Sequence, residues 1–214
     1  NKNEKLRRKI KMNLFIVSIL SYLIGSIPFA YIITKWISGK DVRKYGSGNV
    51  GATNASRVIG IKYGIIVALL DIFKGFMAVI IARLLLPISY PEYFLLLAAL
   101  LAIIGHNWSV FLKFSGGKGV ATTFGVVLGI FPVVFLFFLL TWFLIIIISK
   151  YASLASILSG VILPFITYIY QKPEYYYIIF SVLLALLIII RHRSNIKRLI
   201  QGKESKMSWP PVKG

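Results

Sequence analysis

Apolar residues occur in long runs along this chain, separated by short polar and glycine-rich stretches. A helix needs roughly 20 apolar residues to cross about 30 Å of hydrocarbon, and fewer where its ends are buried in protein. The runs therefore predict membrane helices at residues 12–37, 61–86, 92–104, 120–131, 132–149, 154–170 and 175–190.

The fourth and fifth runs are continuous but contain Pro132. One helix over residues 120–149 would be about 45 Å long at 1.5 Å per residue, too long for a single crossing, and proline breaks a helix interior. We therefore divide it there. The prediction is an all-α polytopic membrane protein of about seven helices, with short re-entrant or loop motifs at the cytoplasmic face. The count falls to five if the short third and fourth segments are re-entrant.

The composition supports a membrane protein with basic loops. Hydrophobic residues make up 58% of the 214 residues, mean hydropathy is +0.82, and 25 Lys and Arg against 6 Asp and Glu give a net charge of +19. A soluble domain this apolar would lack polar surface to cover its core. The apolar fraction excludes disorder, and the absence of cysteine excludes a disulfide scaffold. A nucleic-acid-binding protein would not need so many lipid-compatible runs.

Seven helices place the two termini on opposite sides, and the cations indicate which side is which. One alternating set of loops, together with the C-terminal tail, holds most of the Lys and Arg, whereas the other holds Arg83 and Lys172. By the positive-inside rule, the first set and the C-terminus are cytoplasmic, and the N-terminus is outside.

The N-terminal segment conflicts with this orientation. Six cations within residues 2–11 directly precede the first apolar run, which begins at Met12. We expect native sequence to begin at Met12, with residues 1–11 outside the fold, 12–204 as a single membrane-embedded domain, and 205–214 as a short tail. The alternatives are a genuine basic arm and a signal peptide; the second is disfavoured because residues 12–37 are too long and lack a small-residue cleavage site.

The first polar motif is the run GSGNVGATNASR at residues 46–57. Its glycines let the backbone turn and approach a ligand, and successive free N–H groups can form an anion site. Arg57 can bind a phosphate through two hydrogen bonds. The alternative is a plain turn between two helices. The side chains that can add hydrogen bonds are Ser47, Asn49, Thr53 and Asn54.

The second motif is His106-Asn107-Trp108-Ser109 followed by GGKGVAT at residues 116–122, which leads into an apolar helix. A glycine-rich helix N-terminus carrying Lys118 suits phosphate. It is not a Walker A loop, which would need glycine at Leu112 and Ser or Thr at Gly119. The alternative for Lys118 is an ordinary positive-inside residue.

Two further segments carry polar side chains on the cytoplasmic side. Ser153 and Ser156 lie at the start of the sixth helix, where serine is also a common N-cap. In the tail, His192 and Asn195 are three residues apart, so on a helix they share a face, and Glu204 follows. Contact of this tail with anionic lipid is the alternative, but it does not account for His192 and Asn195.

Asp71 and Lys74, three residues apart within the second apolar run, are interpreted as a structural ion pair. The six carboxylates are too dispersed for a metal-held nucleotide, and no His, Asp or Glu cluster has metal-ligand spacing. A CDP-alcohol phosphotransferase is therefore disfavoured, and neither a metal nor a cofactor is expected.

Taken together, the runs GSGNVGATNASR, GGKGVAT after a Gly-His pair, SLAS and RHRSNIKRLIQGKE resemble the bacterial acyl-phosphate:glycerol-3-phosphate acyltransferase family. The resemblance extends from Gly25 to about Glu204. It implies a seven-helix inner-membrane enzyme that transfers a fatty acyl group from acyl phosphate to the sn-1 hydroxyl of glycerol 3-phosphate without metal. The products would be lysophosphatidic acid and phosphate, in the first step of bacterial phospholipid synthesis. The chain departs from the family at Asn107-Trp108-Ser109, where an aromatic-Pro pair is common, so those positions are left out of the predicted site.

The resemblance also implies roles for individual residues. The expected acyl-phosphate-binding residues are Ser47, Gly48, Asn49, Gly51, Thr53 and Asn54. Those expected to bind glycerol 3-phosphate are Arg57, Gly117, Lys118, Ser153, Ser156, His192 and Asn195. Ser47, Arg57, Lys118, His192 and Asn195 would be catalytic, with Glu204 and His106 in support. The acceptor of the hydroxyl proton stays open between His192 and a phosphate oxygen of the substrate.

The expected partners are acyl phosphate, glycerol 3-phosphate and the lipid bilayer, with no nucleic acid. We also expect a monomer functionally coupled to the enzyme that makes acyl phosphate. The alternative function is a small transporter or channel for phosphate-bearing anions. Transporters usually show internal repeats and midplane sites, whereas this chain shows no repeat and has its glycine motifs at one membrane edge.

Overall fold

The computed structural model describes the chain except for residues 1, 88, 172–173 and 208–214. The described part is helical and contains no strand, which confirms the all-α prediction. The short 3-10 helices are η1 (Val42–Lys44) and η2 (Val110–Leu112). The α-helices are α1 (Lys2–Ser26), α2 (Phe29–Ser38), α3 (Ala52–Ile59), α4 (Ile61–Leu85), α5 (Tyr93–Asn107), α6 (Val120–Ile130), α7 (Pro132–Ser149), α8 (Ala152–Tyr170), α9 (Tyr175–Arg191) and α10 (Arg193–Ile200).

All seven predicted apolar segments are helical, but they differ in their capacity to cross a membrane. By length and composition, five spans qualify in the described part, at Ile10–Ser38, Ile61–Leu85, Tyr93–Leu112, Pro132–Ser149 and Ala152–Tyr170. Helix α9 counts as a sixth when it is taken as one broken span with α10, from which it is bent by 61°. Helix α6, with 11 residues, is shorter than the hydrocarbon layer.

Proline sets two helix boundaries. The predicted break before Pro132 is confirmed, because Phe131 caps α6 and Pro132 opens α7, where its missing N–H costs nothing. The single helix expected over residues 12–37 is instead divided, since α1 ends at Ser26 and Pro28 precedes α2.

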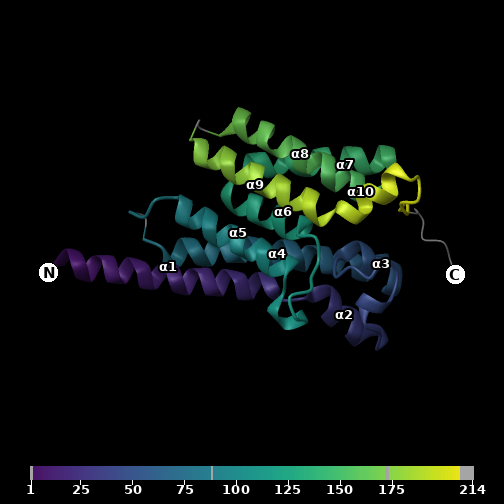
Figure 1. Ribbon diagram of the computed structural model, residues 1–214, viewed down its shortest axis with the longest axis horizontal. Coiled ribbons are helices and arrows are strands. Elements are labelled where there is room, and N and C mark those ends of the chain that lie inside the picture. Colours follow the sequence, from purple (N-terminus) through teal and green to yellow (C-terminus); the bar gives the residue numbers. More distant parts are fainter. Residues whose placement is uncertain (1, 88, 172–173, 208–214) are drawn as a thin grey trace.

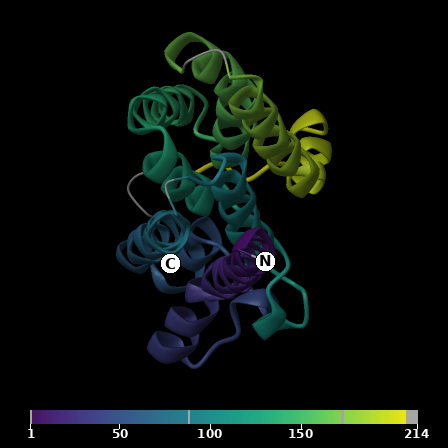
Figure 2. The same ribbon diagram turned by 90° about the vertical axis from the view of Figure 1, so that its left-hand side faces the viewer.

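The helices form two groups with α6 between them. Seen end-on in Figure 2, α7 to α10 lie on one side and α1 to α5 on the other. Glycines allow the closest approaches: a Cβ on Gly125 of α6 would lie 1.8 Å from the Ile72 carbonyl oxygen of α4. A Cβ on Gly25 of α1 would lie 1.9 Å from the Ala102 carbonyl oxygen of α5. Small residues at helix crossings are typical of membrane packing.

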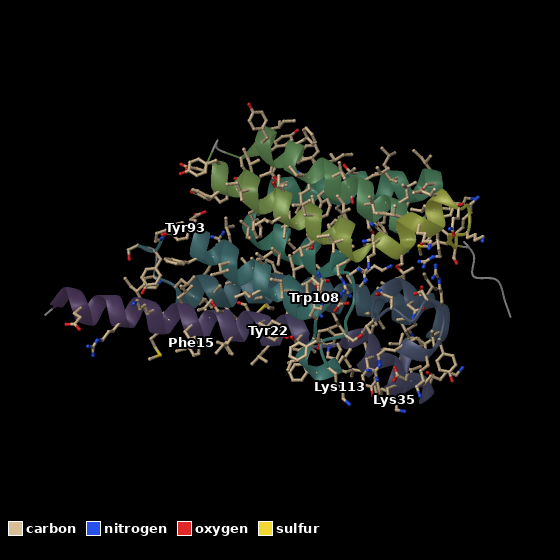
Figure 3. All side chains as sticks on the ribbon, viewed as in Figure 1. Phe15, Tyr22, Lys35, Tyr93, Trp108 and Lys113 are labelled. Carbon is tan, nitrogen blue, oxygen red and sulfur yellow. The ribbon has the colours of Figure 1, made fainter. Side chains whose placement is uncertain are left out.

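The polar motifs gather at one end of the molecule. The beginning of α1 lies at the opposite end from α3 and α10 (Figure 1). Lys35 and Lys113 lie towards that motif-bearing end, whereas Tyr93 lies towards the other, and Phe15 projects from α1 (Figure 3). Large apolar side chains such as Ile147 and Ile148 are 71% and 75% exposed, as lipid-facing residues would be.

The predicted ion pair is confirmed. Lys74 Nζ lies 2.7 Å from Asp71 Oδ1, and both side chains are buried. Lys74 also donates a hydrogen bond to the Ile27 carbonyl oxygen at the break between α1 and α2, at 2.7 Å. His106 of α5 completes the group, with its Nδ1 3.6 Å from Asp71 Oδ1. These contacts therefore join α4 to α5 and to the end of α1.

Candidate active site

A cavity of about 370 Å³ lies where three polar segments meet at the motif-bearing end. Residues that are far apart in the sequence converge on it because α3, α5, α6, α9 and α10 all begin or end there. Its lining comprises Ser47, Gly48 and Asn49 before α3; Trp108, Gly116 and Lys118 between α5 and α6; and Ile190, Arg191, Arg193, Ser194 and Arg198 from α9 and α10.

The first segment is organised by one buried side chain, Asn54. Its Nδ2 donates to the carbonyl oxygens of Val42, Tyr45 and Asn49, each at 3.0 Å, and its Oδ1 accepts the N–H of Ser47 at 2.8 Å. The side chain is 1% exposed. Asn54 therefore shapes the loop from inside, and its predicted contact with a ligand stays a prediction.

This internal bonding changes which backbone groups can meet an anion. The N–H of Ser47 is taken by Asn54, and that of Gly48 donates to Tyr45 at 3.0 Å. The expected row of free N–H groups is thus absent at Ser47 and Gly48. No side chain caps α3 at its N-cap Gly51, and the Asn54 N–H donates to the Gly51 carbonyl oxygen at 3.1 Å, so the first-turn N–H groups of Ala52 and Thr53 stay open to a ligand.

The second segment is pressed against the end of α5. The Gly117 N–H donates to the His106 carbonyl oxygen at 3.1 Å. A Cβ on Gly117 would lie 2.1 Å from His106 Nε2 and 2.5 Å from the Val50 carbonyl oxygen, so only glycine fits. This close packing directs the next residue, Lys118, into the cavity.

Lys118 is held by hydrogen bonding and surrounded by charges. Its Nζ donates to Asn195 Oδ1 of α10. Burial lowers the pKa of Lys118 to about 8. Glu204 opposes this shift, whereas the neighbouring cations Arg198, Arg191 and Arg57 add to it. Lys118 is therefore mainly protonated at neutral pH, and a bound phosphate would hold it so.

His192 lies at the bend between α9 and α10. Its Nδ1 is 2.8 Å from the Ile188 carbonyl oxygen. A carbonyl can only accept, so Nδ1 carries the proton and Nε2 keeps a free lone pair. Burial and the neighbouring Lys118 charge lower the pKa of His192 to about 4, so the ring is neutral at physiological pH.

Glu204 supports this arrangement from the tail. It accepts hydrogen bonds from Ser153 Oγ at 2.8 Å, Asn195 Nδ2 at 2.6 Å and Arg198 Nε at 2.7 Å. These bonds lower the pKa of the Glu204 carboxyl despite the opposing effect of burial. Because Asn195 donates to Glu204, its Oδ1 faces Lys118.

A family model described as glycerol-3-phosphate acyltransferase matches residues 15–202. The chain belongs to this family. It is 44% identical over 189 residues to glycerol-3-phosphate acyltransferase 2 of Moorella thermoacetica, covering 88% of this chain and 95% of the relative. It is also 44% identical over 204 residues to glycerol-3-phosphate acyltransferase of Staphylococcus aureus, covering 92% of this chain and all of the relative.

Solved structures show the same architecture. The glycerol 3-phosphate form of PlsY, an integral membrane glycerol 3-phosphate acyltransferase, superposes with a TM-score of 0.84 at 40% identity. That match covers 91% of this chain and 96% of the other. The lysophosphatidic acid form of PlsY gives a TM-score of 0.82 at 38% identity, covering 91% and 95%. Membership in an acyltransferase family favours the enzyme over the transporter alternative.

In this acyltransferase the predicted residues fall into three groups. Ser47, Gly48, Asn49 and Lys118 line the cavity. The second group lies around the cavity and is bonded to its own members or to the lining: Asn54, Ser153, Asn195 and Glu204. His192 lies close to Lys118, and Arg57 is exposed on α3. The others lie outside the lining: Gly51 and Thr53 at the start of α3, Gly117 within the second segment, His106 beneath it, and Ser156.

Ser156 has its hydroxyl turned into the helix bundle. Its Oγ donates to the Ala152 carbonyl oxygen at 2.7 Å and accepts from Trp142 Nε1 at 3.1 Å. The side chain is buried. In this structure Ser156 therefore joins α7 to α8.

Sequence reasoning missed several lining residues. Trp108 lies outside the predicted site because it departs from the family's common aromatic-Pro pair. The positive-inside rule accounts for Arg191, Arg193 and Arg198 without a ligand, and no motif indicates Ser194. The available signal was their position within the same eight-residue tail as His192 and Asn195.

The part of the chain that the structure describes contains no group of three His, Cys, Asp or Glu suited to a metal ion.

Proposed function

We propose that this glycerol-3-phosphate acyltransferase uses acyl phosphate as its donor and releases lysophosphatidic acid and inorganic phosphate. The observation that carries the proposal is the charge of the cavity. Lys118, Arg191, Arg193 and Arg198 line it, and Glu204 is the carboxylate bonded to this group. A phosphate monoester carries about −1.5 to −2 at pH 7, so two phosphate-bearing substrates match such a site.

The reaction needs positioning and charge stabilisation more than covalent assistance. The sn-1 hydroxyl oxygen attacks the acyl carbonyl carbon, a new ester C–O bond forms, and the C–O bond to phosphate breaks. The electron pair leaves with the phosphate, and the hydroxyl proton is transferred to a basic oxygen. Lys118, Arg193 and Arg198 stabilise the departing charge, and the cavity holds hydroxyl and carbonyl together. These side-chain cations supply the positive charge needed, so the proposal includes metal independence.

The state of His192 favours one proton acceptor. A ring whose pKa is about 4 is a weak base, although its Nε2 can accept a hydrogen bond from the attacking hydroxyl. The second pKa of a phosphate group is about 6, closer to neutral. We therefore assign the proton to a phosphate oxygen of the substrates and give His192 the role of orienting the hydroxyl.

The remaining residues are assigned to the two substrates, and the molecule to an orientation in the membrane. Ser47, Asn49 and the open N–H groups at the start of α3 would bind the acyl-phosphate head. Lys118 and Asn195, with Arg57 nearby, would bind glycerol 3-phosphate. The motif-bearing end would face the cytoplasm in the inner membrane, with the N-terminus outside. Residues 12–204 would form one catalytic domain, acting as a monomer coupled to the acyl-phosphate-forming enzyme.

The test is an assay of purified protein with glycerol 3-phosphate and, in parallel, acyl phosphate or acyl-CoA as the donor. We expect lysophosphatidic acid from acyl phosphate, unchanged by EDTA. Turnover of acyl-CoA alone would contradict the assigned donor. Loss of activity with EDTA, restored by a divalent cation, would contradict metal independence.

A further inference from the structure

The loop that carries Lys118 is held from two sides. On one side, Gly116 and Gly117 pack against the end of α5, where a Cβ on Gly116 would lie 2.2 Å from the His106 carbonyl oxygen. On the other side, the carbonyl groups of both glycines receive the guanidinium of Arg191, the last residue of α9. The loop thus lies between α5 and Arg191.

The Arg191 contacts are specific to a guanidinium. Its Nε donates to the Gly117 carbonyl oxygen at 3.0 Å, and its Nη2 donates to Gly117 at 2.7 Å and to Gly116 at 3.2 Å. The Cζ atom lies 5.1 Å from the centre of the Trp108 ring. A planar fork that also stacks on an aromatic ring cannot be reproduced by lysine.

Among the described residues, no other side chain donates to these two carbonyl groups. Asn195, four residues after Arg191, holds the side chain of the very next loop residue, Lys118. The segment around the bend between α9 and α10 therefore fixes the loop at two adjacent points, its backbone and its lysine ammonium group.

We propose that Arg191 is a positioning residue for acyl transfer: by binding the backbone of Gly116 and Gly117, it places the Lys118 ammonium group where the substrate phosphate binds. Two of its nitrogen atoms are occupied by the loop, and one face is covered by Trp108. Although Arg191 also lines the cavity, these contacts act on the reaction through Lys118. The proposal rests on glycerol 3-phosphate being bound at Lys118, and it does not depend on which acyl donor is used.

The first test compares Arg191→Lys, which keeps the charge but loses the fork, with Arg191→Gln, which loses both. A misplacement of about 1 Å can cost on the order of 100-fold in rate. We expect both variants to lose roughly 10- to 100-fold in kcat/KM for glycerol 3-phosphate, at unchanged unfolding temperature. Lys197→Gln, which removes an exposed cation outside the cavity lining, should stay within about twofold.

A pH profile distinguishes an effect of Arg191 on the position of Lys118 from an effect of the Arg191 charge on the pKa of Lys118. Lys118 is faced by Arg57 from α3, Arg191 from α9, Arg198 from α10 and Glu204 from the tail. Arg191→Gln should raise the alkaline pKa of kcat/KM, because one neighbouring cation is gone. Arg191→Lys should leave that pKa in place while activity still falls.

Chemical rescue provides the decisive measurement. Millimolar guanidinium should restore activity to Arg191→Ala, whereas methylammonium at equal ionic strength should not. Binding of glycerol 3-phosphate without donor, measured by calorimetry, should recover in parallel, and this arm holds whichever donor is correct. Near-normal activity of Arg191→Lys, equal rescue by both cations, or a loss fully explained by less folded protein would each overturn the proposal.

Discussion

The glycine-rich segments 42–51 and 113–119 both bring backbone to the cavity, but different parts of the chain hold them. The first is shaped from within its own sequence neighbourhood, by the side chain of Asn54. The second is held partly by the preceding helix α5, through the bond from the Gly117 N–H to His106, and partly by the distant residues Arg191 and Asn195. The first segment is held by local contacts alone, whereas the second also receives contacts from α9 and α10.

We assign the two segments to different substrates, the first to acyl phosphate and the second to glycerol 3-phosphate. Damage to the first segment should affect acyl phosphate, and damage to the second should affect glycerol 3-phosphate.

The largest effect is expected from Lys118→Ala, because Lys118 stabilises phosphate directly. Loss of one such group costs roughly 100- to 1,000-fold in rate. Steady-state kinetics should show this loss in kcat/KM for glycerol 3-phosphate, with folding unaffected. Lys113→Asn is the matched control, since it removes a nearby exposed lysine and asparagine tolerates the left-handed backbone there (φ 55°). Similar losses in both variants would contradict a specific role for Lys118.

The pH dependence should follow Lys118 on the alkaline side. Its folded-state pKa is lowered to about 8, so the ammonium is present below pH 8 and is lost as the pH rises through that value. We expect kcat/KM for glycerol 3-phosphate to fall above pH 8. In Lys118→Arg the fall should disappear up to about pH 10, because arginine stays charged. An unshifted alkaline limb in that variant would assign the titration to another group.

Asn54→Asp should disrupt the first segment and spare the second. Aspartate cannot donate to the three carbonyl oxygens that Asn54 Nδ2 binds, and each buried acceptor left unpaired costs about 1–3 kcal/mol. We expect about a tenfold higher KM for acyl phosphate, a smaller change for glycerol 3-phosphate, and faster amide hydrogen exchange over residues 42–49. Ser56→Ala, which removes a hydroxyl that donates to the Thr53 carbonyl oxygen within α3, should change neither constant. Equal effects on both substrates would remove the distinction between the segments.

The smallest effect on activity is expected at the buried ion pair. Asp71→Asn leaves Lys74 buried with a weakened partner, and breaking such a pair costs about 3–5 kcal/mol of stability. Thermal unfolding should show this cost, partly recovered in the double variant Asp71→Asn/Lys74→Met. Kinetic constants per folded molecule should change less than about threefold. A large loss of kcat in stable protein would place the pair in the chemistry.

The sequence predicted the helices well, because apolar runs of this length have few alternatives in a bilayer, and Pro132 marked a true boundary. It missed the break at Pro28 because hydropathy continues across it into α2. A count of charges could not predict which cations line the cavity, because the 61° bend at His192 decides where the cations of α10 lie. Whether Asn54 faced a ligand or its own loop likewise depended on how Gly46 and Gly48, both with positive φ, turn the backbone.

The central claim is direct acyl transfer between two phosphate-bearing substrates in one cationic cavity. The most direct measurement is a rapid-quench experiment on purified protein, following phosphate and lysophosphatidic acid with and without glycerol 3-phosphate. The account predicts equal amounts of both products when glycerol 3-phosphate is present, and no burst of phosphate from acyl phosphate alone. A phosphate burst equal to the enzyme concentration in the absence of glycerol 3-phosphate, with acyl-labelled protein, would contradict it.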